Sequence, residues 1–289
     1  MKSVEITYRY EANRAPLRAR PSDAGEAMRR LDDGSRAFAE LLNNLGEEGE
    51  AARRVIRVDP RDLALFGDED APKQRPYAAV LGCSDARVPI ELIFNEGPND
   101  LFVVRVAGNV LGNDVLASLK YAVEHLGSSL KLVVILGHSG CGAVSAAVDI
   151  FLDPASYLSL ASKHILRNLL DRLLVVVHAT AKRMAAKWGP DVTRRPGYRE
   201  ALIEASVVAN AAFAAHAVQQ HIGGADARGL RAAYGVYVLS TREVWTPRAG
   251  GAEHAGLADP PDDPEGFDKF SDAVMRSERI ASLLERAPE

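Results

Sequence analysis

The chain has 289 residues, 47% of them hydrophobic and 26% charged, which is the composition of a folded globular protein. Its net charge of -4 at pH 7 gives no broad basic surface, so we expect no nucleic-acid partner. No apolar run approaches the roughly 20 residues that cross a bilayer, and residues 1–20 lack the apolar core of a secretory signal. We therefore expect no membrane association and a cytoplasmic location.

The first half of the chain is predicted to alternate between helices and strands. Residues 24–45 have the apolar spacing of a helix, and a charged loop is expected from there to about residue 75. Three short apolar runs rich in valine are typical of strands buried on both faces of a parallel sheet: residues 77–82, 101–107 and 131–137. Apolar residues at helical spacing over 113–126 connect the last two runs, which indicates an α/β fold.

The second half of the chain is predicted to be mainly helical. Its helices are expected at residues 143–151, 165–188 and 197–221. An apolar run at residues 232–239 is expected to add an edge strand. Residues 246–266 are rich in Pro, Gly and Asp, so we expect a flexible linker there, followed by a last short helix at residues 267–284.

Two short motifs come directly after predicted strands. Residues 83–87 read CSDAR, and residues 138–141 read HSGC. Ligands of α/β sheets bind beyond the carboxyl ends of the strands, which is where both motifs fall. Two thiolates and one imidazole suit zinc, and three protein ligands leave the fourth tetrahedral position open for water. Cys83, His138 and Cys141 are therefore predicted to form a catalytic zinc site.

Each of these side chains has a plainer interpretation when it is taken alone. A single buried cysteine is usually packed in the core, and a single histidine usually lies at the surface or in a hydrogen bond. However, the only two cysteines of the chain both lie at predicted strand ends, which packing alone does not explain. A redox or purely structural role for the two thiols remains an alternative, although the chain has no Cys-x-x-Cys motif.

The two motifs resemble the Cys-x-Asp-x-Arg and His-x-x-Cys signature of β-class carbonic anhydrases. The similarity extends over most of residues 74–147, including the LFVVR run at 101–105. It implies a parallel central sheet with a mixed edge strand, flanked by helices, in a homodimer or a dimer-based oligomer. Relative to the family, residues 152–198 form an enlarged helical region, and the C-terminal tail has no counterpart.

The resemblance divides the chain into three parts. Residues 1–22 are an N-terminal extension, residues 23–245 are the zinc-dependent β-carbonic anhydrase-like domain, and residues 246–289 are a linker and a C-terminal helical tail.

The activity implied by the resemblance is the reversible hydration of carbon dioxide to bicarbonate and a proton, by attack of zinc-bound hydroxide, with one zinc per chain. Asp85 is expected to accept a hydrogen bond from that hydroxide, or to bind the zinc itself as a fourth ligand in an inactive state. Arg87 is expected to hold the Asp85 carboxylate in a two-pronged pair, away from the metal. An ordinary surface salt bridge is the plainer interpretation of these two residues.

Four more residues are predicted to bind substrate, three of them by the resemblance. Gln74 matches a glutamine that donates a hydrogen bond to a substrate oxygen. Phe102 and Tyr121 match residues that line a small apolar substrate pocket, often across the dimer interface. Gly142, which follows the second cysteine ligand, completes this set.

Two related functions would retain the same zinc site. A hydrolase that acts on carbonyl sulfide or carbon disulfide needs the same zinc, aspartate and arginine. A catalytically silent bicarbonate-binding or sensing protein would keep the zinc but hold Asp85 on the metal. Comparing carbon dioxide hydration with sulfide release, on protein of known zinc content, separates these functions.

Overall fold

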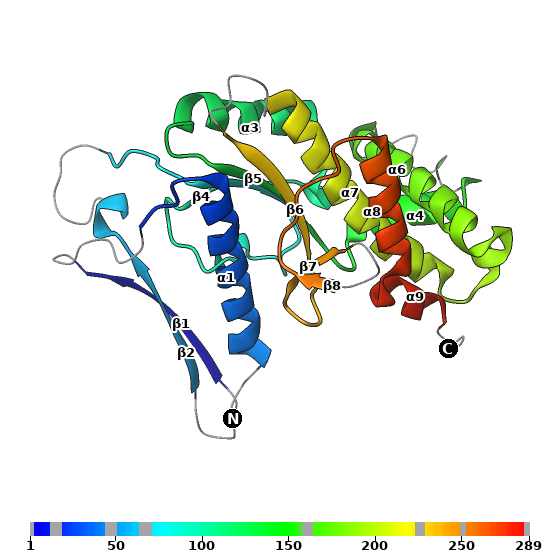
Figure 1. Ribbon diagram of the computed structural model, residues 1–289, viewed down its shortest axis with the longest axis horizontal. Helices are drawn as coiled ribbons and strands as arrows, with labels where there is room; N and C mark the ends of the chain where they lie inside the picture. Colours follow the sequence, from blue (N-terminus) through cyan, green and yellow to red (C-terminus); the bar gives the residue numbers. More distant parts are fainter. Residues whose placement is uncertain are drawn as a thin grey trace.

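The computed structural model describes residues 3–11, 19–43, 51–63, 71–155, 157, 164–222, 229–248 and 253–285. Its centre is a six-stranded sheet with the strand order β4-β3-β5-β6-β7-β8 (Figure 1). In chain order these strands are β3 (Ala78–Gly82), β4 (Leu101–Arg105), β5 (Leu132–His138), β6 (Arg231–Tyr237), β7 (Val244–Pro247) and β8 (Glu253–Ala255). The neighbours from β4 to β6 are parallel, whereas β7 and β8 pair antiparallel. The predicted α/β fold with a mixed edge is thereby confirmed.

Helices cover both faces of this sheet because its inner strands are apolar on both sides. One face carries Val80, Leu132 and Val134, and it packs against α1 (Ala24–Asn43) and α2 (Ile90–Ile93). The opposite face carries Leu81 and Ile135. It packs against α3 (Asn113–Leu126) and α7 (Tyr198–Ile222), and α4 (Gly142–Leu152) and α6 (His164–Trp188) pack in turn against α7. Successive side chains of a strand point to opposite faces, so the two cores form on the two sides of one sheet.

The helix α7 is apolar over a longer stretch than we expected of any segment of this sequence. Within the described residues, α7 contains a segment, Tyr198–His221, that is long and apolar enough to cross a membrane by length and composition. However, 78% of its most apolar window is buried inside the protein. Such burial is typical of a core helix in an α/β protein.

The prediction of a charged loop between the first helix and residue 75 is wrong for part of that segment. β1 (Ser3–Tyr10) and β2 (Ala51–Val58) pair in parallel register as a separate two-stranded sheet beside α1 (Figure 1). The 3-10 helix η1 (Pro60–Leu63) follows β2. Only the inner face of β2 is apolar, with Ile56 and Val58 buried, and arginines interrupt the run. The short apolar pattern therefore gave too weak a strand signal.

Two further predictions about the second half are corrected. The run at 232–239 is not an edge strand, because β6 lies between β5 and β7 and is buried over most of its length. The segment predicted as a flexible linker contains the end of β7 and all of β8, which extend the sheet. Antiparallel pairing of two very short strands explains why periodicity did not indicate them.

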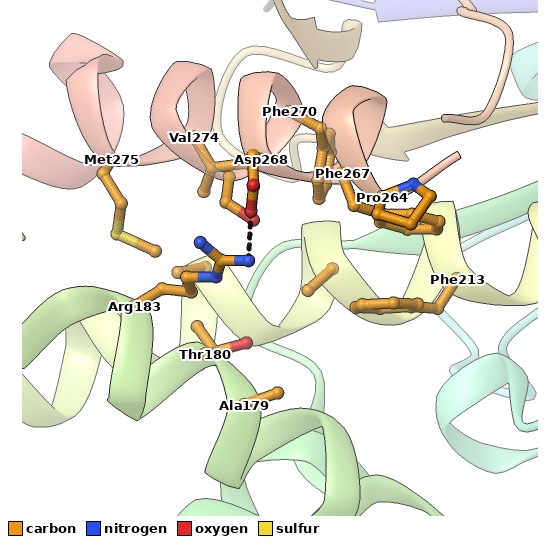
Figure 2. A pocket seen from close by; sticks show the side chains of 13 residues that line it. Ala179, Thr180, Arg183, Phe213, Pro264, Phe267, Asp268, Phe270, Val274 and Met275 are labelled. Atoms are coloured by element: carbon orange, nitrogen blue, oxygen red, sulfur yellow. Dashed lines mark hydrogen bonds and ion pairs between the residues drawn. The ribbon is translucent and has the colours of Figure 1, made fainter. Parts of the chain in front are cut away.

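The C-terminal tail folds as two helices, α8 (Pro264–Arg276) and α9 (Glu278–Leu284), where one was expected. α8 lies across α6 and α7 around a cavity of about 460 Å³ (Figure 2). The Phe267 ring of α8 stacks on the Phe213 ring of α7, with centroids 4.6 Å apart. Asp268 of α8 pairs with Arg183 of α6. The tail is therefore packed on the main domain through both apolar and charged contacts.

Candidate metal centre

The register of the parallel strands brings the two predicted motifs to the same edge of the sheet. Gly82, the last residue of β3, lies beside Leu136 of β5. Cys83 and His138 therefore lie at the carboxyl ends of neighbouring strands, where α/β folds bind their ligands. Cys141 follows in the turn after β5 and is the N-cap residue of α4.

These three side chains form a compact cluster of buried donor atoms. Their ligand atoms all lie within 4.8 Å of one another, and the sulfur atoms of Cys83 and Cys141 are 4.0 Å apart. Two sulfurs on one tetrahedral zinc would be about 3.8 Å apart, because each Zn–S bond is about 2.3 Å. The two sulfurs are therefore about as far apart as two thiolate ligands of one zinc ion, and the His138 nitrogen lies close to both.

The His138 ring presents one nitrogen to this cluster. Its Nδ1 lies 3.0 Å from the Ser139 carbonyl oxygen, so we assign the ring proton to Nδ1. Its Nε2 is buried and has no hydrogen-bond partner among the described residues. A buried polar atom without a partner is unfavourable, and metal ligation would satisfy it.

The surroundings of Cys83 favour the thiolate form that zinc binds. Contact with the Cys141 thiol lowers the pKa of Cys83 in the metal-free protein, and the nearby His138 ring adds to this effect. The same contact raises the pKa of Cys141. The backbone N–H of Gly108 also donates to the Cys83 sulfur, at 3.2 Å. Cys141 itself lies at the positive end of the α4 dipole, which stabilises a negative sulfur when a metal replaces the thiol proton.

Asp85 and Arg87 form a two-pronged ion pair beside the cluster. Arg87 Nε donates to Asp85 Oδ1 at 2.9 Å, and Arg87 Nη2 donates to Oδ2 at 2.7 Å. These bonds hold the pKa of the Asp85 carboxyl well below its ordinary value. Asp85 Oδ2 also lies 3.8 Å from His138 Nε2, which places an ionised carboxylate at the border of the donor cluster.

Two residues around the cluster, Arg105 and Glu204, were not predicted from the sequence as site residues. Arg105 donates to the carbonyl oxygens of both Cys83 and Asp85, at 3.1 and 2.6 Å. Glu204 accepts a hydrogen bond from the backbone N–H of Gly140, at 2.7 Å. Arg105 belongs to the LFVVR run that carried the resemblance, whereas Glu204 is 64 residues from its partner in sequence. Only the fold brings Glu204 to the turn.

The four residues assigned to substrate lie in different environments. Gly142 is the first residue of α4, and a side-chain carbon placed on it would meet nothing within 4 Å, so it borders open space. Phe102 is half-buried on β4. Tyr121 is 48% exposed on α3, and Gln74 is exposed in the segment before β3. Among the described residues, no hydrogen bond joins Gln74, Phe102 or Tyr121 to the donor cluster.

Comparison with known proteins points to one family. The family model described as carbonic anhydrase matches residues 78–223, which is half of the chain. Carbonic anhydrase 2 of Mycobacterium tuberculosis is 46% identical over 91 residues, covering 30% of this chain and 43% of that protein. Carbonic anhydrase of Mycolicibacterium smegmatis is 52% identical over 76 residues, covering 26% and 36%. The chain thus spans less than half the length of these relatives.

Among solved structures, the β-carbonic anhydrase CcaA is similar to this chain. It is 27% identical, with a TM-score of 0.47, over 60% of this chain and 80% of that one. The family match includes both motifs at the edge of the sheet. The chain therefore belongs to the carbonic anhydrase family that this model describes.

Proposed function

We propose that this chain catalyses the reversible hydration of carbon dioxide to bicarbonate and a proton, in the cytoplasm, with one zinc ion held by Cys83, His138 and Cys141. The observation that carries the proposal is the donor cluster itself. Two sulfurs and an unpartnered imidazole nitrogen lie within 4.8 Å of one another at the carboxyl edge of a parallel sheet. Zinc in such a site supplies a Lewis acid that makes a water molecule nucleophilic near neutral pH.

Asp85 is proposed to orient the attacking oxygen atom. Because Arg87 donates to both carboxylate oxygens, the carboxylate stays ionised and paired with Arg87 beside the donor cluster. An ionised carboxylate in this position accepts a hydrogen bond from the attacking oxygen and directs a lone pair towards carbon. The pair is already formed in the structure, which favours a working enzyme over a silent protein with Asp85 on the metal.

Gly142 is proposed to bind a substrate oxygen through its backbone N–H. This group lies in the first turn of α4, where backbone donors have no partner within the helix. With no side chain at Gly142, substrate can approach the helix terminus closely. Negative charge that develops on bicarbonate would be stabilised there.

The remaining substrate residues are proposed to act in a homodimer. β4 is an edge strand, yet its first four residues are apolar and only half-buried. Tyr121 is an exposed aromatic residue on α3. A partner subunit on this face would cover both surfaces and would bring Phe102 and Tyr121 into a closed apolar pocket.

The deciding experiment is stopped-flow hydration of carbon dioxide by protein of determined zinc content, at pH 7 and near pH 9. We expect fast turnover that requires one zinc per chain and that is higher at pH 9, because two thiolates reduce the pull of zinc on its water. Zinc-loaded protein that is inactive at both pH values would overturn the proposal. Sulfide release from carbonyl sulfide in that case would identify the related hydrolase.

A further inference from the structure

The C-terminal tail reaches the turn that joins two of the metal-ligand residues. Arg279, in the first turn of α9, donates from Nη2 to Glu204 Oε2 at 2.6 Å. The other carboxylate oxygen of Glu204 accepts the backbone N–H of Gly140 at 2.7 Å. Gly140 lies between His138 and Cys141, so a single carboxylate connects the tail to the ligand turn.

The Gly140 peptide unit is held from its other side as well. Its carbonyl oxygen lies 3.4 Å from Nη2 of Arg87, the residue that pairs with Asp85. Gly140 has a φ of 62°, which is the left-handed region that favours glycine. A turn in this conformation depends on its external hydrogen bonds, because no regular secondary structure fixes it.

The ion pair that ends this chain of contacts is largely shielded from water. The side chains of Glu204 and Arg279 are 12% and 23% exposed. The Arg279 guanidinium also lies over the Trp245 ring, 5.9 Å from its centroid, within the range of a cation–π contact. Charge-assisted hydrogen bonds in such surroundings are stronger than those at an open surface.

The position of Arg279 is fixed by the packing of the tail. Ile280, Leu283 and Leu284 of α9 are buried in the main core. α8 adds the Phe267–Phe213 stack and the Arg183–Asp268 pair seen in Figure 2. The turn and α9 both line a cavity of about 650 Å³.

We propose that Arg279 is a positioning residue for the metal centre. Through Glu204 and the Gly140 peptide, the tail holds the ligand turn in the geometry that binds metal, and the inference rests on the proposed zinc site. Removing Arg279 leaves the Glu204 carboxylate without its cation, which weakens its hold on Gly140. The turn should then open more often and release zinc faster.

The test uses the full chain with Arg279→Met, and with Arg276→Met as the matched control. Arg276 also lies in the tail, but it pairs with Asp272 on its own helix. We expect the Gly140 amide of the metal-free Arg279→Met protein to exchange hydrogen about tenfold faster than in the wild type. The loss of a charge-assisted hydrogen bond supports a change of that size. The Arg279→Met protein should also lose zinc to a chelator about tenfold faster than the wild type. The Arg276→Met control should lose zinc at the wild-type rate, and Arg279→Lys should lose it at a rate between those of Arg279→Met and the wild type.

Wild-type exchange and wild-type zinc release in folded Arg279→Met protein would overturn the inference. If that variant does not fold, Glu204→Gln serves instead, because it keeps an oxygen for Gly140 but removes the charge that pairs with Arg279. It should release zinc faster than the wild type, and unchanged release would equally overturn the inference. Neither measurement depends on carbon dioxide turnover. A protein that behaves as expected here but hydrates no carbon dioxide would contradict only the proposed function.

Discussion

At the scale of the residue, the metal centre depends on contacts that fix each donor before a metal arrives. The Ser139 carbonyl sets the ring orientation of His138, and the Gly108 N–H faces the Cys83 sulfur. Arg87 holds Asp85 beside the donors without adding a fourth ligand. Binding and turnover are therefore assigned to different side chains, which substitution can separate.

Cys83→Ser and Asp85→Asn should affect zinc and turnover differently. A hydroxyl replaces a thiolate donor in the first variant, so zinc and activity should be lost together. The second variant keeps all three donors but removes the charge that orients the attacking oxygen, so zinc should remain while the rate of hydration falls about 10²-fold. Zinc analysis and stopped-flow hydration of the same samples measure both effects. A fully active Asp85→Asn protein would contradict the role given to Asp85.

Asp32 gives a prediction about stability and pH. It accepts the backbone N–H of Leu257 at 2.8 Å, and burial raises the pKa of its carboxyl to about 6. Because this pKa is higher in the folded than in the unfolded state, folding is favoured by protonation. The stabilising effect is complete below about pH 4 and is lost as the pH rises through 6.

Asp32→Asn removes this titration while keeping an oxygen for Leu257. We expect the variant to be more stable than the wild type by about 1–2 kcal/mol at pH 7.5, and to differ little from it near pH 4. Urea unfolding at the two pH values measures the difference. Asp33→Asn is the control, because Asp33 lies on the same helix but is 71% exposed. Equal effects of the two substitutions would show that burial of Asp32 is not the cause.

At the scale of the element, strands with continuous apolar runs could be predicted from the sequence. Strands whose place depends on pairing with another strand could not. β3 and β5 were predictable because both faces of each strand are buried, which makes the run continuous. The donor set was predictable for the same reason, since both motifs follow these strands directly. β1, β2 and β8 were missed because their register is set by a partner strand, which a local pattern does not contain. Glu204 was missed because only tertiary packing brings α7 to the ligand turn.

Helix α1 packs unusually close to the backbone of the main domain at Gly34. A side-chain carbon placed there would lie 1.9 Å from the Phe94 carbonyl oxygen, which is a backbone atom that cannot turn aside. Gly34→Ala should therefore destabilise the protein by about 2–4 kcal/mol, although alanine is the better helix former. The midpoint of urea unfolding measures this effect.

Gly25→Ala, in the first turn of the same helix, is the matched control. Its added carbon would meet only side-chain atoms of Asp23 and Arg29, at 3.2 and 3.4 Å. We expect this variant to stay within about 1 kcal/mol of the wild type. A Gly34→Ala protein as stable as the Gly25→Ala protein would show that α1 can shift away from Phe94.

At the scale of the whole molecule, the C-terminal tail and the β4 edge of the sheet differ in how they are covered. The tail helices α8 and α9 are packed against α6 and α7 (Figure 1). Their Val274, Ile280 and Leu283 are buried in the core. At the other side of the sheet, β4 has a strand neighbour on one side only, and its apolar residues are half-buried. An apolar edge of this kind is unfavourable in water unless another surface covers it. A second copy of the chain is the partner that we propose.

The dimer predicts a definite outcome for Tyr121→Glu. Tyr121 is 48% exposed, and its ring stacks on His125 of the same helix, so a charge there should not disturb the fold of one chain. Buried between two subunits, the same charge would be strongly unfavourable because its desolvation is uncompensated. We expect light scattering to give the mass of two chains for the wild type and of one chain for the variant, at equal zinc content. Lys120→Glu, on the same helix but 64% exposed and paired with Glu124, is the control for added negative charge. A Tyr121→Glu protein that remains dimeric would place the subunit contact elsewhere, and Phe102 and Tyr121 would then lose their proposed place in a shared pocket.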